Sequence, residues 1–147
     1  NEKIQRLKAQ IVKKTVLFSE KKDSKINQYQ VLIIDTIGLL TKVYSYADIA
    51  YVGGAAGKSG LHNILEPATF GLPIIIGKNF DKFPEAKQLE KLAGLFSVAS
   101  AEELFKIMTK MVKDEQFRSK TGMISGHFIN SNTGATQSVL SYLKRNH

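Results

Sequence analysis

The sequence contains no cysteine and no tryptophan, and only three of its 147 residues are proline. Without cysteine, neither a disulfide framework nor a thiolate metal site holds the chain together. No run of apolar residues approaches the ~18 to 20 that a membrane-spanning helix requires, and the first twenty residues lack the apolar segment of a secretory signal. We therefore expect a chain that is stabilised by packing and does not itself cross a bilayer.

Arginine is also scarce, although the chain is basic. The 21 Lys and Arg residues exceed the 13 Asp and Glu residues, which gives a formal net charge of +8, but only Arg6, Arg118 and Arg145 are arginines. A basic balance favours anionic partners such as nucleic acid, acidic lipid or phosphorylated small molecules, and lysines dispersed on solvated helices also produce it. Nucleic-acid sites usually interleave arginines and aromatic residues with the lysines. We therefore expect no nucleic-acid partner.

Short apolar runs alternate with helical patterns along the chain. Strands are predicted at 15–18, 31–34, 49–52, 73–76 and 95–98. Helices are predicted at 2–13, 37–46, 63–70, 83–92, 101–113, 116–130 and 135–145. Such an alternation indicates βαβ units, and the predicted class is α/β: a Rossmann-like, doubly wound parallel sheet with helices on both faces. The continuous apolar run at 31–34 suits a strand that is buried on both faces.

The length predicts one domain, spanning residues 1–147. Because a helix precedes the first predicted strand, we expect that the domain's own first strand and any preceding domain are missing from this sequence. Ligands of doubly wound sheets bind beyond the carboxyl ends of the strands. The loops at 35–39 and 53–66 are therefore the candidate binding segments.

The segment from Gly53 to Asn63 is a glycine-rich connection between a strand and a helix. Glycines let the backbone approach an oxyanion closely, and a helix N-terminus adds free N–H groups and partial positive charge. Gly57-Lys58-Ser59 is similar to the end of a P-loop, but Val52 stands where that motif needs its first glycine. The segment also lacks a G-x-G-x-x-G that opens a helix. A phosphate cradle of another type and a plain flexible connection both remain open.

The helix start that follows has two interpretations. Asn63 and Glu66 have the spacing of a capping box, and Pro67 is tolerated in a first helical turn. Alternatively, the two oxygens of the Glu66 carboxylate accept hydrogen bonds from the vicinal hydroxyls of a ribose. Both interpretations are compatible with each other.

Several motifs in order resemble one family. They are Asp35-Thr36-x-Gly38, Ala47-Asp48, Gly53-Gly54, Gly60-x-His62-Asn63-x-Leu65-Glu66-Pro67-Ala68, Gly71-x-Pro73 and Gly77. This combination resembles the donor site of GT-B glycosyltransferases, and among them most closely the 3-deoxy-D-manno-octulosonic acid (Kdo) transferases. The matches run from about residue 31 to residue 143. By resemblance the chain is the donor-nucleotide-binding C-terminal half of a GT-B enzyme.

The resemblance implies inverting transfer of Kdo from CMP-Kdo to a lipid A precursor, without a metal or other cofactor. It implies that backbone groups of Ile37, Gly38 and Leu39 line the cytidine. It also implies that Gly60, His62, Asn63, Ile64 and Leu65 lie at the phosphate and that Glu66 holds the ribose. The catalytic base, a glutamate, belongs to the acceptor domain in this family, so no catalytic residue is expected here and the chain alone is expected to be inactive. His62, His127 and His147 do not have metal-ligand spacing.

The chain departs from the family pattern at two positions. Leu39 stands where the family often has Glu, so only backbone recognition is expected there. Lys82-Phe83 stands where the family often has Asn-Phe, and Lys82 is either an exposed lysine or a partner for an anionic sugar carboxylate. Phe80, Phe83 and Pro84 either wall the donor pocket or belong to the core. In GT-B enzymes the last helix commonly returns to the first domain, so Val139, Leu140 and Leu143 are expected to be exposed.

Two alternatives stay open. The first is a GT-B enzyme that uses a UDP-sugar, as a transferase or an epimerase, with Lys58 as the additional cation that a diphosphate needs. The second is a basic adaptor domain that docks on an anionic membrane, which leaves the string from His62 to Glu66 without an explanation. For the full-length enzyme, the resemblance implies the cytoplasmic face of the bacterial inner membrane.

Overall fold

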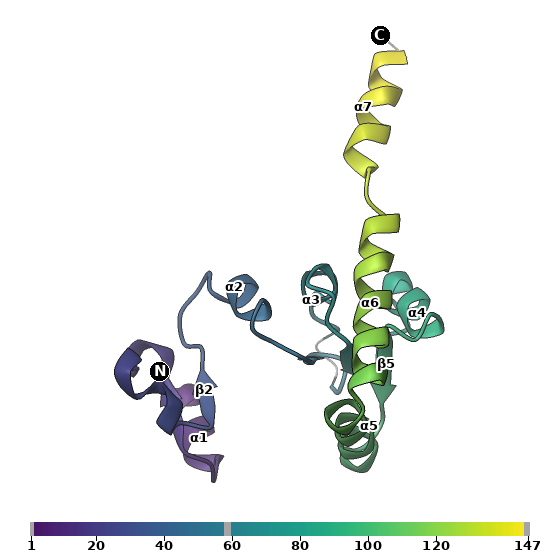
Figure 1. Ribbon diagram of the computed structural model, residues 1–147. Coiled ribbons are helices and arrows are strands. Elements are labelled where there is room, and N and C mark those ends of the chain that lie inside the picture. Colours follow the sequence, from purple (N-terminus) through teal and green to yellow (C-terminus); the bar gives the residue numbers. More distant parts are fainter. Residues whose placement is uncertain (1, 58–59, 146–147) are drawn as a thin grey trace. The chain divides into compact units, whose positions relative to one another are not determined.

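A computed structural model describes residues 2–57 and 60–145. The chain divides into two compact units, the first ending at Val43 and the second beginning at Tyr44, and each unit is described by itself. In Figure 1 the first unit is coloured purple to blue and the second teal to yellow.

The first unit contains a helix and a two-stranded parallel sheet. Helix α1 (Glu2–Gln10) leads to strand β1 (Thr15–Leu17), which pairs with β2 (Val31–Ile33). Two short 3-10 helices, Phe18–Glu20 and Asp23–Gln28, lie between these strands. β1 buries Val16 and Leu17, whereas Leu32 in β2 is 40% exposed. The prediction that 31–34 is buried on both faces is therefore wrong for the described structure.

The second unit contains a three-stranded parallel sheet in the order β3-β4-β5. Its strands are β3 (Ala50–Val52), β4 (Ile74–Gly77) and β5 (Leu95–Val98). The central strand, β4, is flanked on both sides, and its residues Ile74, Ile75 and Ile76 are completely buried. These residues are β-branched, which suits a pleated and buried strand. The predicted strand at 73–76 is confirmed.

Five helices of the second unit follow the predicted order. They are α3 (Leu65–Thr69), α4 (Pro84–Lys91), α5 (Ala101–Lys113), α6 (Glu115–Ser131) and α7 (Ala135–Arg145). α4 and α5 contact β5, and α6 packs against α3, α4 and α5 (Figure 1). Ser100 caps α5 by accepting a hydrogen bond from the backbone N–H of Glu103 at 3.2 Å. The predicted break before residue 135 is also confirmed.

Close backbone contacts explain why glycines occur where α6 meets the turn after α3. A Cβ on Gly122 would lie only 2.2 Å from the carbonyl oxygen of Gly71, which itself has φ +66°. Gly122 therefore lets the helix approach the Gly71-Leu72-Pro73 turn that leads into β4. The Gly71-x-Pro73 motif has a packing role here.

The predicted α/β class with parallel strands is confirmed, but two predicted features differ. The described strands form two sheets, and the helix predicted at 37–46 is only α2 (Leu40–Tyr44). Val139, Leu140 and Leu143 on α7 are exposed, as expected. No helix among the described residues is long and apolar enough to span a bilayer.

Candidate nucleotide-binding site

The loop after β3 folds back on itself at a pair of glycines. Gly54 has φ +93°, and a Cβ there would lie 1.9 Å from the carbonyl oxygen of Gly60. The backbone N–H of His62 donates a hydrogen bond to the carbonyl oxygen of Gly53 at 3.1 Å. Any larger residue at position 54 would force the two arms of the loop apart. The Gly53-Gly54 motif is thus required by a close backbone approach.

The end of β4 clamps the same loop. A Cβ on Gly77 would lie 2.2 Å from the backbone nitrogen of Ala56. The backbone N–H of Asn79 donates to the carbonyl oxygen of Ala55 at 2.9 Å, and its side-chain amide donates to that of Gly57 at 3.0 Å. The loop is consequently bonded to the carboxyl end of β4, where ligands of doubly wound sheets bind.

The start of α3 is held by Asn63 in a manner that differs from the predicted capping box. Asn63 Oδ1 accepts a hydrogen bond from the backbone N–H of Leu65 at 2.9 Å. Asn63 Nδ2 donates to Glu66 Oε1 at 3.1 Å. A capping box instead uses the N–H of the third helical residue and returns the glutamate to the backbone N–H of the cap. The prediction is wrong in this detail because Asn has an amide that bonds the carboxylate directly.

The residues predicted to lie at the phosphate and ribose have different exposures. Leu61 and Ile64 are buried in the core and anchor the loop, so Ile64 presents only its backbone. His62 and Asn63 are exposed, Leu65 is 40% exposed, and Glu66 is half-buried. Glu66 is therefore both oriented by Asn63 and accessible from solvent.

Tyr44 is a neighbour of Glu66 that the sequence analysis did not identify. The ring of Tyr44 packs against that of Phe70, with the ring centroids 6.0 Å apart. Burial raises the pKa of the Tyr44 phenol above its ordinary value of 10.0, and the negative charge of Glu66 raises this pKa further. No motif spacing connects positions 44 and 66, so only the fold reveals the pair.

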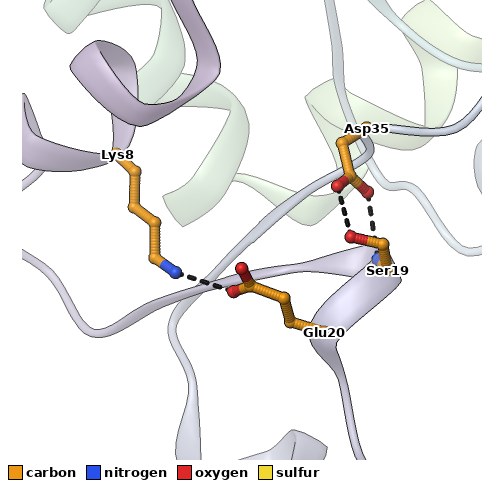
Figure 2. A network of polar contacts seen from close by, with 4 residues as sticks. All are labelled: Lys8, Ser19, Glu20 and Asp35. Atoms are coloured by element: carbon orange, nitrogen blue, oxygen red, sulfur yellow. Dashed lines mark hydrogen bonds and ion pairs between the residues drawn. The ribbon is translucent and has the colours of Figure 1, made fainter. Parts of the chain in front are cut away.

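In the first unit, Asp35 ties the ends of the two strands together (Figure 2). Asp35 Oδ1 accepts a hydrogen bond from the backbone N–H of Ser19 at 3.0 Å, and Asp35 Oδ2 accepts one from the Ser19 hydroxyl. These bonds, the hydroxyl's first, lower the pKa of the Asp35 carboxyl below its ordinary value of 3.8. Figure 2 also shows the neighbouring ion pair between Lys8 Nζ and Glu20 Oε2, at 2.9 Å.

Ile37, Gly38 and Leu39 form a turn rather than the first turn of a helix. Gly38 has φ +86° with open space around it, and the Ile37 side chain is fully exposed. The carbonyl oxygen of Leu39 accepts the N–H of Val43, so the helical bonding begins only here. These three residues belong to the first unit and residues 60–66 to the second. Their shared role at one nucleotide stays a prediction.

A cavity of about 500 Å³ opens beside the glycine loop in the second unit. Its lining includes Gly57, Gly60, Asn79, Asp81, Lys82 and Phe83. Of the aromatic residues considered for a pocket wall, Phe83 lines this cavity, whereas Phe80 is buried in the core. Pro84 is the first residue of α4.

Two further predictions are limited by the residues that the structure describes. Lys58, considered as a diphosphate contact, lies outside them. Within residues 2–57 and 60–145, no group of three or more His, Asp or Glu side chains gathers in a way that could hold a metal ion. Metal independence of the reaction stays a prediction.

Known proteins similar to this chain support the same fold and family. A 3-deoxy-D-manno-octulosonic acid transferase of Haemophilus influenzae is 36% identical over 117 residues, which are 78% of this chain and 27% of that protein. The enzyme of the same name from Aquifex aeolicus is 33% identical over 103 residues, which are 67% of this chain and 29% of that protein. The chain thus spans less than a third of the length of these relatives. No family model matches the chain.

A solved structure is similar as well. It is described as the C-terminal CMP-Kdo binding domain of WaaA from Acinetobacter baumannii, and it matches with a TM-score of 0.68 and 20% sequence identity. The match covers 84% of this chain and 66% of that one. The fold is therefore that of the C-terminal domain of a GT-B glycosyltransferase.

The similarity to this solved structure gives the chain the fold of the GT-B class. Within that class, the resemblance to the Kdo transferases is confirmed by relatives that carry this name.

Proposed function

We propose that this chain binds CMP-Kdo as the donor-nucleotide-binding part of an inverting GT-B glycosyltransferase. The full-length enzyme would transfer Kdo to a lipid A precursor in the synthesis of the lipopolysaccharide inner core. The observation that carries the proposal is the position of Glu66. The loop whose close backbone contacts require glycine leads to the start of α3, where Asn63 orients the half-buried Glu66 carboxylate. Curated relatives of the chain are named as Kdo transferases.

In this role Glu66 accepts hydrogen bonds from the two ribose hydroxyls. Its Oε1 already accepts one bond from Asn63, and a carboxylate has capacity for several more. The phosphate lies against the loop at Gly60, with His62 beside it and the backbone N–H groups of Asn63 and Ile64 facing it. The N–H of Leu65 already donates to Asn63 Oδ1, so we assign it no phosphate contact.

The cytosine is recognised by backbone groups of Ile37, Gly38 and Leu39. Gly38 allows the turn because its φ of +86° is accessible to glycine at little cost. Backbone N–H and C=O groups suit a pyrimidine edge that carries both donors and acceptors. Fixed N–H groups at the phosphate then stabilise the negative charge that develops on CMP as it leaves.

We assign no catalytic residue to this chain, and we propose that the displacement requires no metal or other cofactor. Addition of a chelator should then leave CMP binding unchanged. Because the acceptor is a lipid, the full-length enzyme is proposed to act at the cytoplasmic face of the inner membrane. The net charge of +8 suits an anionic surface there.

Calorimetric titration of the chain with CMP, UMP and UDP tests the proposal. We expect CMP to bind more tightly than UMP and UDP. Tighter binding of UDP would instead support a UDP-sugar enzyme. If the chain binds anionic vesicles but none of the nucleotides, the proposal is overturned and a basic adaptor domain that docks on an anionic membrane is supported instead.

A further inference from the structure

We propose that the cavity beside the glycine loop is an anionic-sugar subsite in which Lys82 binds the carboxylate of the transferred sugar acid. This inference rests on the proposed function and adds to it a residue that selects the sugar rather than the nucleotide. The cavity shares Gly60 with the proposed phosphate site, so a group attached to that phosphate can reach it.

The charge of the cavity favours an anion. Among the residues that the structure describes, the charged ones that line it are Asp81 and Lys82. Asp81 Oδ1 lies 3.6 Å from Lys87 Nζ, so its charge is partly compensated by α4. Among residues 2–57 and 60–145, no carboxylate lies within ion-pair distance of Lys82. The ammonium group of Lys82 is therefore a charge available to a ligand in the described part of this lining.

The remaining lining suits a hydroxylated ring. Cζ of Phe83 lies 3.9 Å from the position that a Cβ on Gly60 would occupy, so the ring lies close to the glycine loop and forms an apolar wall of the cavity. The C–H face of a sugar packs on such an apolar surface. Asn79, whose side chain is fixed by its bond to Gly57, adds an amide that can bond a hydroxyl. A cation, an amide and an aromatic wall together fit a sugar acid.

The test compares CMP, CMP-Kdo and the carboxamide of CMP-Kdo as ligands of the parent chain, Lys82→Gln and Lys82→Arg. An ammonium–carboxylate contact at a solvent-accessible position should contribute about two- to fivefold in affinity. We expect Lys82→Gln to weaken CMP-Kdo binding by that factor and CMP binding by less than twofold. Lys82→Arg should retain most of the affinity, and the carboxamide should bind parent and Lys82→Gln equally. Lys91→Gln, which removes an exposed charge at the end of α4, is the matched control.

Two results distinguish failure of this inference from failure of the proposed function. If Lys82→Gln weakens CMP and CMP-Kdo equally, or leaves CMP-Kdo binding unchanged, the carboxylate assignment is wrong while nucleotide binding stands. If the parent chain binds neither CMP nor CMP-Kdo, the proposed function is wrong and the subsite is overturned with it.

Discussion

The loop at 53–66 and the turn at 35–39 both follow a strand and both contain a glycine with positive φ, but they are held in different ways. The first is fixed by close backbone packing, because Gly54 and Gly77 each leave no room for a Cβ. The second is open around Gly38 and is fixed by the hydrogen bonds between Asp35 and Ser19. The same residue type therefore meets a steric requirement in one loop and only a conformational one in the other.

Substitution of Gly54 by Ala should have the largest effect. The new Cβ would be 1.9 Å from the carbonyl oxygen of Gly60, and alanine disfavours φ +93°. The strain and the displaced backbone together should lower the free energy of unfolding by about 2 to 4 kcal/mol. Urea unfolding followed by circular dichroism measures this loss. Gly57→Ala is the control, because nothing lies within 4 Å of its Cβ position, and it should change stability by less than about 0.5 kcal/mol. Equal effects of the two variants would refute the packing explanation.

Replacement of Glu66 by Gln separates ligand binding from helix capping. A hydrogen bond to a charged group contributes roughly 1.5 to 3 kcal/mol, so CMP affinity should fall about ten- to a hundredfold. The melting temperature should change little, because Gln can still accept a hydrogen bond from Asn63 and a lost cap costs only about 1 kcal/mol. The pKa of Tyr44 should also move down toward 10.0, since one cause of its elevation is the charge of Glu66. Unchanged CMP affinity with a sharp drop in melting temperature would mean that Glu66 is only a structural residue.

Gly38→Ala should have a smaller effect than Gly54→Ala, because its cost is conformational alone. Alanine at φ +86° is destabilised by about 1 to 2 kcal/mol, and the space around position 38 is open. Hydrogen exchange of the β1 and β2 amides measures the effect in the first unit. Gly38→Asn should lose less stability than Gly38→Ala, since asparagine tolerates the left-handed region better than alanine does. A loss for Gly38→Ala as large as that for Gly54→Ala would show that the turn is packed after all.

The smallest effect concerns the bond between Ser19 and Asp35. The pKa of Asp35 is lowered in the folded chain, so its stabilising contribution is present above the ordinary value of 3.8 and is lost as the pH falls through the folded value. Ser19→Ala removes the hydroxyl that contributes most to this shift, and the pKa of Asp35 should rise toward 3.8. Carboxyl carbon shifts recorded against pH measure it, with Ser119→Ala on α6 as the control. An unchanged Asp35 pKa in Ser19→Ala would argue against the hydrogen bond between the Ser19 hydroxyl and Asp35 that Figure 2 shows.

Much of the second unit was predictable because its pattern is periodic and its helix boundaries are marked. The run at 73–76 is a local feature and forms a strand as expected, and the helix expected at 101–113 begins directly after the capping residue Ser100. The start of α2 was missed because apolar residues on both sides of Gly38 continue a helical pattern that its positive φ interrupts. The partial exposure of β2 was not predicted, because an apolar run does not show how many neighbouring elements cover the strand.

The candidate site was predictable only in part. The string from Gly60 to Glu66 identified the loop, but the bond from the Asn63 amide to Glu66 depends on side-chain rotamers that spacing does not fix. The approach of Tyr44 to Glu66, which are 22 residues apart in the sequence, follows from tertiary packing within the second unit.

The most direct test of nucleotide binding by the loop at 53–66 is a residue-resolved NMR titration of the 147-residue chain with CMP. Saturable shifts should appear at Gly60 and at the amides of residues 62–66, together with those of Ile37, Gly38 and Leu39. The amides of α5 and α7 should not move. Saturable CMP shifts that leave residues 60–66 unchanged, or no shifts at any concentration, would contradict the assignment of this loop as the nucleotide site.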